Sequence, residues 1–195
     1  MTNTSTSGGR LAVALVHYPV LDRHGGIQTT AITNLDVHDL ARSSRTYGCA
    51  AFYVVTPVTA QQEQARAIIG FWEGDTGKRR NKDRTEAMSR VHVTASVNDA
   101  IAAESAIGGA RPIVVVTSAK PQGTVPYGEL RRRLDAGAHA LVLFGTGSGL
   151  ADSVLELADL VLAPLIGPAD VDGTRWNHLS VRSAAAIILD RLRGS

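Results

Sequence analysis

Short apolar runs rich in β-branched residues alternate along this chain with longer segments of helical period. The apolar runs predict six strands, at residues 11–17, 50–56, 91–94, 113–117, 140–144 and 160–165. Apolar positions spaced three and four residues apart predict six helices, at residues 35–47, 60–72, 97–107, 127–134, 150–157 and 179–192. Strands that alternate with helices are typical of a parallel sheet covered by helices on both faces. The pattern therefore predicts an α/β fold of six β/α units.

The two ends of the chain depart from this pattern. Residues 1–10 are rich in Ser, Thr, Gly and Asn and offer nothing to bury, so we expect a disordered tail there and a single domain at residues 11–195. The last predicted helix, at residues 179–192, is apolar on more than one stripe. Such a helix packs on two sides, which predicts a second partner such as another subunit.

Composition narrows the class of protein. The 195 residues are 44% hydrophobic and 19% charged, which excludes a disordered, collagen-like or disulfide-scaffold protein. No apolar run approaches the ~20 residues that span a bilayer, and the opening residues lack the apolar core of a secretory signal, so we expect a cytoplasmic protein with no membrane contact. The single cysteine, Cys49, excludes an internal disulfide and a thiolate zinc cage, and no metal site is expected.

Three loops that follow predicted strands are candidates for ligand binding, because ligands of open α/β sheets bind beyond the carboxyl ends of strands. They are residues 117–124, 145–149 and 166–177. Glycines at 145, 147 and 149 would let backbone N–H groups approach a ligand, although a plain tight turn has the same pattern. The loop lacks the lysine of a P-loop, which disfavours ATP and GTP. A dinucleotide fingerprint would follow the first strand, so NAD is also disfavoured and a nucleoside without phosphates fits better.

Polar residues gather in the first predicted helix and in two basic clusters. Asp36, Asp39 and Arg42 recur at a spacing of three, which fits a functional face and equally a solvated helix face with ion pairs. The basic clusters are KRRNKDR, at residues 78–84 in a predicted polar connection, and RRR at residues 131–133. A mobile loop rich in Arg and Lys is one way to engage phosphates, and solvated surface is the other reading. With a net charge of only +2, any contact with nucleic acid must be local.

Five segments of the chain carry a family resemblance. They are LVHYPV (15–20), TNLDVHDLARSSRTYG (33–48), FYVVTP (52–57), LFGTGSGL (143–150) and NHLSVRSAAAIILDRL (177–192). Together they resemble the SPOUT superfamily of S-adenosylmethionine (SAM) dependent RNA methyltransferases, and within it the small bacterial group found alone or fused to tRNA (guanine-N1)-methyltransferase. The resemblance implies a Rossmann-like parallel sheet with a C-terminal trefoil knot, a homodimer, SAM as cofactor, and a nucleotide of structured RNA (tRNA or rRNA) as methyl acceptor.

The resemblance also implies roles for individual residues. The SAM-binding residues would be Thr117, Ser118, Phe144, Gly145, Thr146, Gly147, Gly149, Pro164, Leu165, Asn177, His178, Leu179 and Ser180. Arg42 matches an arginine of the related ribose methyltransferases and would orient the nucleophile or a phosphate, while Asp36 or His38 would accept a proton. RNA-binding residues would be Arg79, Arg80, Lys82 and Arg84. Asp36 and His178 each stand where those enzymes carry Asn, which leaves ribose oxygen and base nitrogen both open as the methylated atom.

Two other classes of protein compete with this reading. A knotted module that binds SAM or RNA without catalysis would share most of the motifs, and the presence of Arg42 favours an enzyme over it. A nucleotide-dependent oxidoreductase would place its glycine loop after the first strand. Here the glycines follow the fifth, which disfavours that class.

Overall fold

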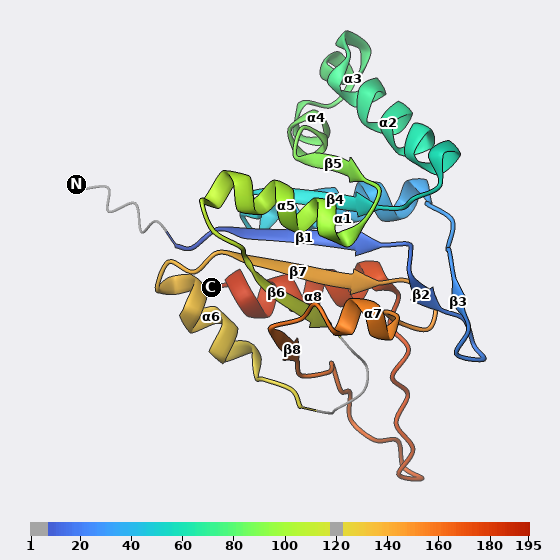
Figure 1. Cartoon of the computed structure of the whole chain (residues 1–195), viewed down its shortest axis with the longest axis vertical. Coiled ribbons are helices and arrows are strands. Elements are labelled where there is room, and N and C mark those ends of the chain that lie inside the picture. The colour runs from blue at the N-terminus through green and yellow to red at the C-terminus, as the bar shows by residue number, and fades with distance from the viewer. Residues whose placement is uncertain (1–7, 118–122) are drawn as a thin grey trace.

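A computed structural model describes residues 8–117 and 123–195 and contains a six-stranded parallel sheet (Figure 1). In spatial order the strands are β5 (Val91–Thr94), β4 (Ala51–Val55), β1 (Leu11–Val16), β7 (Ala140–Gly145), β6 (Ile113–Thr117) and β8 (Leu160–Leu162). Every neighbouring pair in this sheet is parallel. The six predicted strands and the α/β class are therefore confirmed, with β8 shorter than the predicted 160–165.

The six predicted helices are also present, with ends within one residue of the prediction in four of them and displaced by two residues in the other two. They are α1 (Asn34–Thr46), α2 (Thr59–Glu73), α5 (Val97–Gly108), α6 (Tyr127–Asp135), α7 (Asp152–Leu155) and α8 (Val181–Arg193). The predicted helix at 150–157 is only α7, because the backbone of residues 149–151 instead bonds to the segment around Pro19 and Leu21. Ser180 caps α8 by accepting from the Ser183 backbone, so Leu179 lies before the helix. None of the helices in the described ranges is long and apolar enough to cross a membrane.

Four short elements were not predicted. Two of them, β2 (Val20–Leu21) and β3 (Ile27–Gln28), form a small antiparallel hairpin. The others, α3 (Asp75–Arg80) and α4 (Lys82–Met88), occupy the stretch predicted to be a polar connection. The polar sequence gives little sign of how these helices pack against the core. A Cβ added to Gly77 would lie 2.5 Å from the backbone of Trp72, and Ala87 and Met88 are buried. The basic cluster at residues 78–84 is therefore helical, and the expectation of a loop there is wrong.

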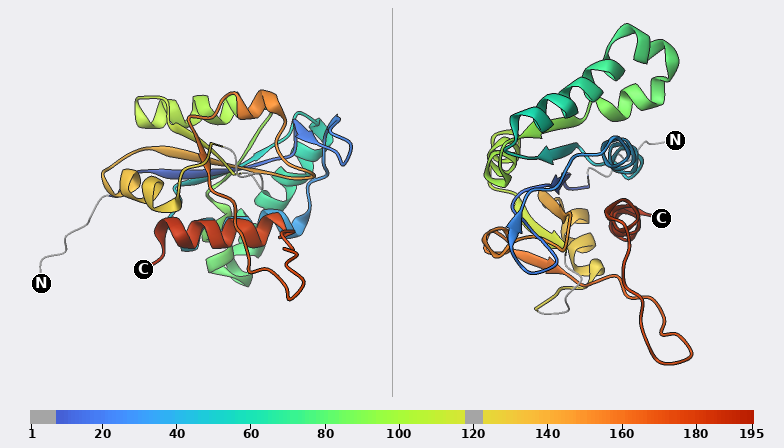
Figure 2. Two further views of the ribbon diagram at one scale, coloured as in Figure 1. Left: turned by 90° about the horizontal axis from the view of Figure 1, so that it is seen from below. Right: turned by 90° about the vertical axis from the view of Figure 1, so that its right-hand side faces the viewer.

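Helices cover both faces of the sheet (Figure 2). Successive strand residues point to opposite faces, so Leu11 and Val13 of β1 pack in the layer of α1, α2, α4, α6 and α8, whereas Ala12 and Ala14 pack with α5 and α7. Every residue of β1 is consequently buried. Burial on both faces explains why the strand sequences read as continuous apolar runs rather than as alternating ones.

The boundary of the domain lies before residue 10. Gly9 is buried and its backbone N–H donates to the Leu134 carbonyl, so the expected tail does not extend to residue 10. Arg10 forms two hydrogen bonds to the carboxylate of Glu104, at 2.7 and 2.9 Å. Glu104 is fully buried and also accepts from Tyr53 Oη at 2.8 Å and contacts His139 Nε2 at 2.6 Å. These partners hold the pKa of Glu104 below its usual value despite burial. Residues 1–7 of the expected tail lie outside the described residues.

This buried carboxylate generates a prediction about stability. Glu104→Ala removes the shared partner of Arg10, Tyr53 and His139 and should lower the free energy of unfolding by roughly 3 kcal/mol, as loss of one member of a buried ion pair does. Urea unfolding measures the change. As a matched control, Glu86→Ala removes an exposed carboxylate that pairs with Arg45 and Arg90, and its urea midpoint should stay close to wild type. Equal midpoints for the two variants would contradict the assignment.

Candidate functional site

A pocket of about 730 Å³ opens where the carboxyl ends of β1, β6 and β7 meet. Strands that run parallel end at the same edge of a sheet, so the loops that follow them converge there. Most of the lining comes from four segments: the β1–α1 connection, the loop after β7, the start of α7, and the long segment from β8 to α8. The volume falls in the range of sites for small organic ligands.

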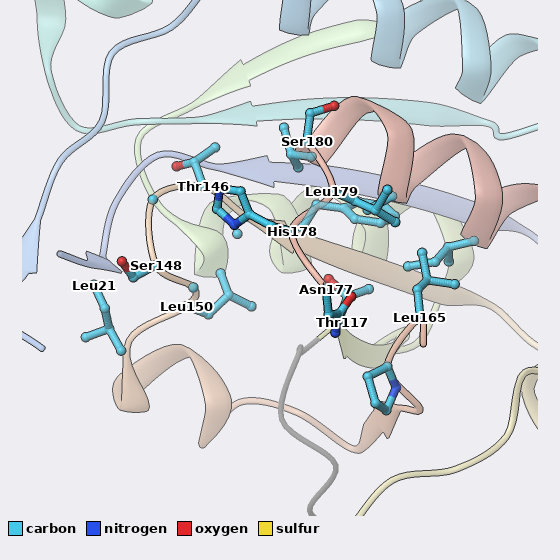
Figure 3. Close-up of a pocket in the computed structure, with 18 of the residues that line it drawn as sticks. Leu21, Thr117, Thr146, Ser148, Leu150, Leu165, Asn177, His178, Leu179 and Ser180 are labelled. Atoms are coloured by element: carbon cyan, nitrogen blue, oxygen red, sulfur yellow. The ribbon is translucent and has the colours of Figure 1, made fainter. Parts of the chain in front are cut away.

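The pocket unites the residues that the sequence analysis assigned to cofactor binding. Its lining includes all twelve of them within the described residues, namely Thr117, Phe144, Gly145, Thr146, Gly147, Gly149, Pro164, Leu165, Asn177, His178, Leu179 and Ser180. The thirteenth, Ser118, lies outside the described residues. Figure 3 shows Asn177, His178 and Leu179 on one wall, with the His178 ring directed toward Thr146 on the opposite loop.

The glycine loop, residues 145–149, is held by the β2 strand. Ser148 donates its backbone N–H to Leu21 at 2.9 Å, and Leu21 donates to the Gly149 carbonyl at 2.9 Å. Gly147 has φ +61°, and a Cβ there would lie 2.8 Å from the Leu21 carbonyl oxygen, so this position requires glycine twice over.

The expectation that this loop offers its backbone N–H groups to a ligand is wrong for three of its residues. Thr146 donates its N–H to the Val16 carbonyl, Ser148 to Leu21, and Gly149 to Thr146. These bonds lie within the protein, so the three groups are already satisfied. The loop was correctly located by its glycines, but their role is to permit the close approach of β2.

A partly buried hydrogen-bond chain begins beneath this loop. His17 is fully buried at the end of β1, and its Nδ1 lies 3.0 Å from Thr30 Oγ1. Thr30 Oγ1 lies 2.5 Å from Thr146 Oγ1, which donates to the Val16 carbonyl at 3.0 Å. Burial lowers the pKa of His17 to about 4, with the negative charge of Asp36 opposing the shift, so the ring is neutral at pH 7.

The charge on the pocket wall is negative. Among the described residues of the lining, Asp36 and Asp152 are the carboxylates and there is no Lys or Arg. Asp36 accepts from Thr33 Oγ1 at 2.6 Å as part of the α1 cap, and Arg182 Nη1 lies 3.6 Å from its other oxygen. Asp152, at the start of α7, is exposed. The wall therefore suits a cationic ligand better than a phosphate.

The three proposed catalytic residues are not brought together within one chain. Asp36 lines the pocket, but residues two positions apart on a helix point about 200° apart, and His38 faces the other way. His38 Nε2 accepts from the Trp72 indole at 3.3 Å, and burial together with the charge of Arg84 lowers its pKa. Its basic nitrogen is thus occupied, and the structure does not support His38 as a proton acceptor at the pocket.

Arg42 lies on that other side of α1, in a second surface hollow. This hollow has a volume of about 500 Å³ and is also lined by Arg84 of α4. The Arg84 guanidinium stacks 4.8 Å from the centre of the Trp72 ring. Arg79, Arg80 and Lys82 are exposed nearby on α3 and α4. The structure therefore joins Arg42 to the basic cluster and separates it from the pocket of its own chain.

The lining residues that the sequence analysis missed include Leu21, Thr30, Tyr127 and Asp152. Leu21 and Thr30 belong to the connection after the first strand, which was not among the candidate loops. Its glycines, Gly25 and Gly26, do not repeat the alternating pattern of residues 145–149, and the adjacency of β1 and β7 brings the connection to the site. Tyr127 was assigned only to a helix, yet its hydroxyl donates to the Ala163 carbonyl at 2.6 Å. The described residues contain no group of three His, Cys, Asp or Glu side chains placed to hold a metal ion.

Comparison with curated proteins identifies relatives of two lengths. The chain is 44% identical over 187 residues to the tRNA (guanine-N(1)-)-methyltransferase of Nitratidesulfovibrio vulgaris, covering 96% of this chain and 43% of that protein. It is 37% identical to an uncharacterized protein of Aquifex aeolicus, covering 92% of this chain and 86% of that one. The chain thus spans less than half the length of the relative with a named activity.

Solved structures share the fold at low sequence identity. A probable methyltransferase from Bordetella pertussis has a TM-score of 0.57 at 17% identity, covering 96% of this chain and 93% of that one. The SpoU methyltransferase AviRb from Streptomyces viridochromogenes, in complex with the cofactor AdoMet, has a TM-score of 0.56 at 17% identity, covering 95% and 57%. A sequence profile of a family described as SAM-dependent RNA methyltransferase matches residues 10–194. The chain therefore belongs to the family of SAM-dependent RNA methyltransferases.

Proposed function

We propose that this chain transfers a methyl group from SAM to a nucleotide of structured RNA, such as tRNA or rRNA. The observation that carries the proposal is the chemistry of the 730 Å³ pocket, whose described lining holds two carboxylates and no Lys or Arg. SAM carries a positive sulfonium and an ammonium group, and both are stabilised by nearby carboxylates. A nucleoside triphosphate would be repelled by the same wall.

The pocket also fits the apolar part of such a ligand. Phe144, Leu150, Leu165 and Leu179 contribute apolar surface beside the polar groups of Asn177 and His178. In this proposal the thirteen residues assigned from the sequence bind SAM, with Ser118 among them. SAM itself supplies an activated methyl group, so the chain contributes mainly by holding the acceptor in line with it. Asp36, at the pocket wall, is the residue available to accept a proton.

RNA would bind across the hollow between α1 and α4. Arg42 and Arg84 line that hollow, and Arg79, Arg80 and Lys82 extend the positive surface along α3 and α4. Guanidinium groups match the geometry of phosphates, so this surface would contact the RNA backbone and position the acceptor. The names of the longer relatives include guanine-N1 methylation, and their extra length leaves the methylated atom of this chain open.

A homodimer would reconcile the two separated sites. Helices α1 and α8 pack against each other, and Leu35 of α1 and Ile187 of α8 leave 61% and 37% of their surface exposed. Burial of this apolar face against a second copy would cover it and bring Arg42 of one subunit to the pocket of the other. A trefoil knot formed by the C-terminal segment remains part of the proposal. The alternative, a silent SAM- or RNA-binding module, is favoured only by the distance of Arg42 from the pocket within one chain.

The first prediction concerns the ligand. Titration calorimetry should detect saturable binding of SAM and of its demethylated product, and no binding of ATP or NAD, because the described wall has carboxylates and no phosphate-binding lysine. Ser148→Trp, which places a bulky side chain on the pocket wall, should abolish the SAM signal. Binding of NAD or ATP in place of SAM would overturn the proposed function.

The second prediction concerns RNA. Replacing Arg79 and Arg80 by Gln should lower the slope of log affinity against log salt by about 1.4 to 1.8, since each lost phosphate contact removes about 0.7 to 0.9. SAM affinity should not change. Replacing Arg132 and Arg133 by Gln removes the same charge from α6, where both arginines already pair with Glu129, and should leave the slope unchanged. An equal effect of both double variants would argue against a local RNA surface.

The third prediction concerns the shared site. Arg42→Ala and Ser148→Trp should each be inactive, yet mixing and exchanging their subunits should restore about a quarter of wild-type activity. In a mixed dimer one site receives both lesions, while the other combines an intact Arg42 with an intact pocket. Both variants must first be shown to fold and to exchange subunits. No recovered activity, or a monomer in sedimentation, would contradict a site built from two chains.

A further inference from the structure

The positions of the protons in the His17 chain follow from its acceptors. A carbonyl oxygen only accepts, so the Thr146 hydroxyl donates its one proton to the Val16 carbonyl. At the 2.5 Å contact between the two threonines, Thr30 is therefore the donor. Because the Thr30 hydroxyl already donates its one proton to Thr146, the donor at the 3.0 Å contact between Thr30 and His17 is Nδ1 of His17. The order of donation is His17 to Thr30 to Thr146 to the Val16 carbonyl.

Within the part of the chain that the structure describes, this order leaves the His17 ring with one hydrogen-bonded nitrogen and one nitrogen without a partner. Its Nδ1 carries the proton, and Nε2 is buried without a hydrogen-bond partner among the described residues. A buried nitrogen without a partner is costly, and an apolar side chain would fill the same space without that cost. The contribution of the imidazole is therefore the hydrogen bond that it donates to Thr30.

The same order determines what the pocket wall offers. Thr30 and Thr146 both line the pocket, and each keeps only an oxygen lone pair for a ligand. Two further hydroxyls of the lining behave alike, because Thr117 donates to the Leu143 carbonyl at 3.0 Å and Tyr127 donates to Ala163. Together with the carboxylates of Asp36 and Asp152, these hydroxyls make six side chains of the lining that can accept hydrogen bonds from a ligand and donate none.

We propose that His17 is a positioning residue that orients Thr30 and Thr146 as acceptors, so that the part of the wall formed by these two side chains selects a ligand group that donates a hydrogen bond. That group is an amine, an ammonium or a hydroxyl. The inference rests on the proposed cofactor site and deepens it, because it assigns one wall of the pocket to the donor groups of SAM. It also gives His17, whose ring is hydrogen-bonded to Thr30, a role in ligand selection.

Titration calorimetry with SAM tests this chain of contacts. His17→Leu and Thr30→Val should each weaken binding about tenfold, the usual loss for one oriented hydrogen bond. His17→Asn keeps an N–H donor near the position of Nδ1, and Thr30→Ser keeps the hydroxyl, so both should bind SAM close to wild type. Because His17 acts through Thr30, the double variant His17→Leu, Thr30→Val should bind no more weakly than Thr30→Val alone.

The outcomes separate this inference from the proposed function. A wild-type protein that binds no SAM overturns the proposed function. SAM binding by the wild type with unchanged affinity in His17→Leu overturns the inference alone. Additive losses in the double variant, or an Asn variant as weak as the Leu variant, would show that His17 acts only by general packing. Thermal unfolding of every variant identifies any that is not folded at the titration temperature, and Thr30→Val then carries the test together with Thr30→Ser.

Discussion

The pairing of β1 with β7 is the contact on which the rest of the site depends. It joins Leu11 to Ala140 at one end and Val16 to Gly145 at the other, so segments 129 residues apart in sequence end side by side. The glycine loop then lies against β2, and Thr30 reaches Thr146. The same pairing puts His17, the residue after β1, beneath the loop. Without this register neither the pocket nor the hydrogen-bond chain under it would exist.

The polar groups of the pocket are arranged for a ligand that is positive and rich in donors. The hydroxyl protons of Thr30, Thr117, Tyr127 and Thr146 are directed into the protein, and two carboxylates stand on the wall. The glycine-loop N–H groups of Thr146, Ser148 and Gly149 donate to protein carbonyls. Such preorganisation costs nothing when the ligand arrives, because the protein has already fixed the dipoles. It explains how a glycine loop after a parallel strand can serve a purpose unlike that of a phosphate-binding loop.

Helical geometry divides the polar face of α1 between two sites. Asp36 belongs to the pocket, and Arg42 belongs to the hollow that it shares with Arg84 and the basic helices. The separation makes sense if RNA is held by one surface and its reacting nucleotide is delivered to another. The apolar residues exposed on α1 and α8 support a second copy of the chain as the means of bringing the two surfaces together.

The sequence by itself determined the type and order of the main elements, because a strand buried on both faces and an amphipathic helix each leave a local pattern. It also located the lining residues that follow β6, β7 and β8, since loops after parallel strands share one edge. Local signals did not reveal α3 and α4, whose polar residues are anchored by Trp72 and Met88 from the core.

Only the tertiary structure decided which distant groups meet. Thr30, Tyr127 and Asp152 line the pocket because the strand order places their segments there, and strand order is set by long-range packing. His38 lies outside the pocket lining, and its ring packs against Trp72. The direction of donation from His17 to Thr146 depends on distances of about 3 Å between separate loops, which no local pattern in a sequence encodes.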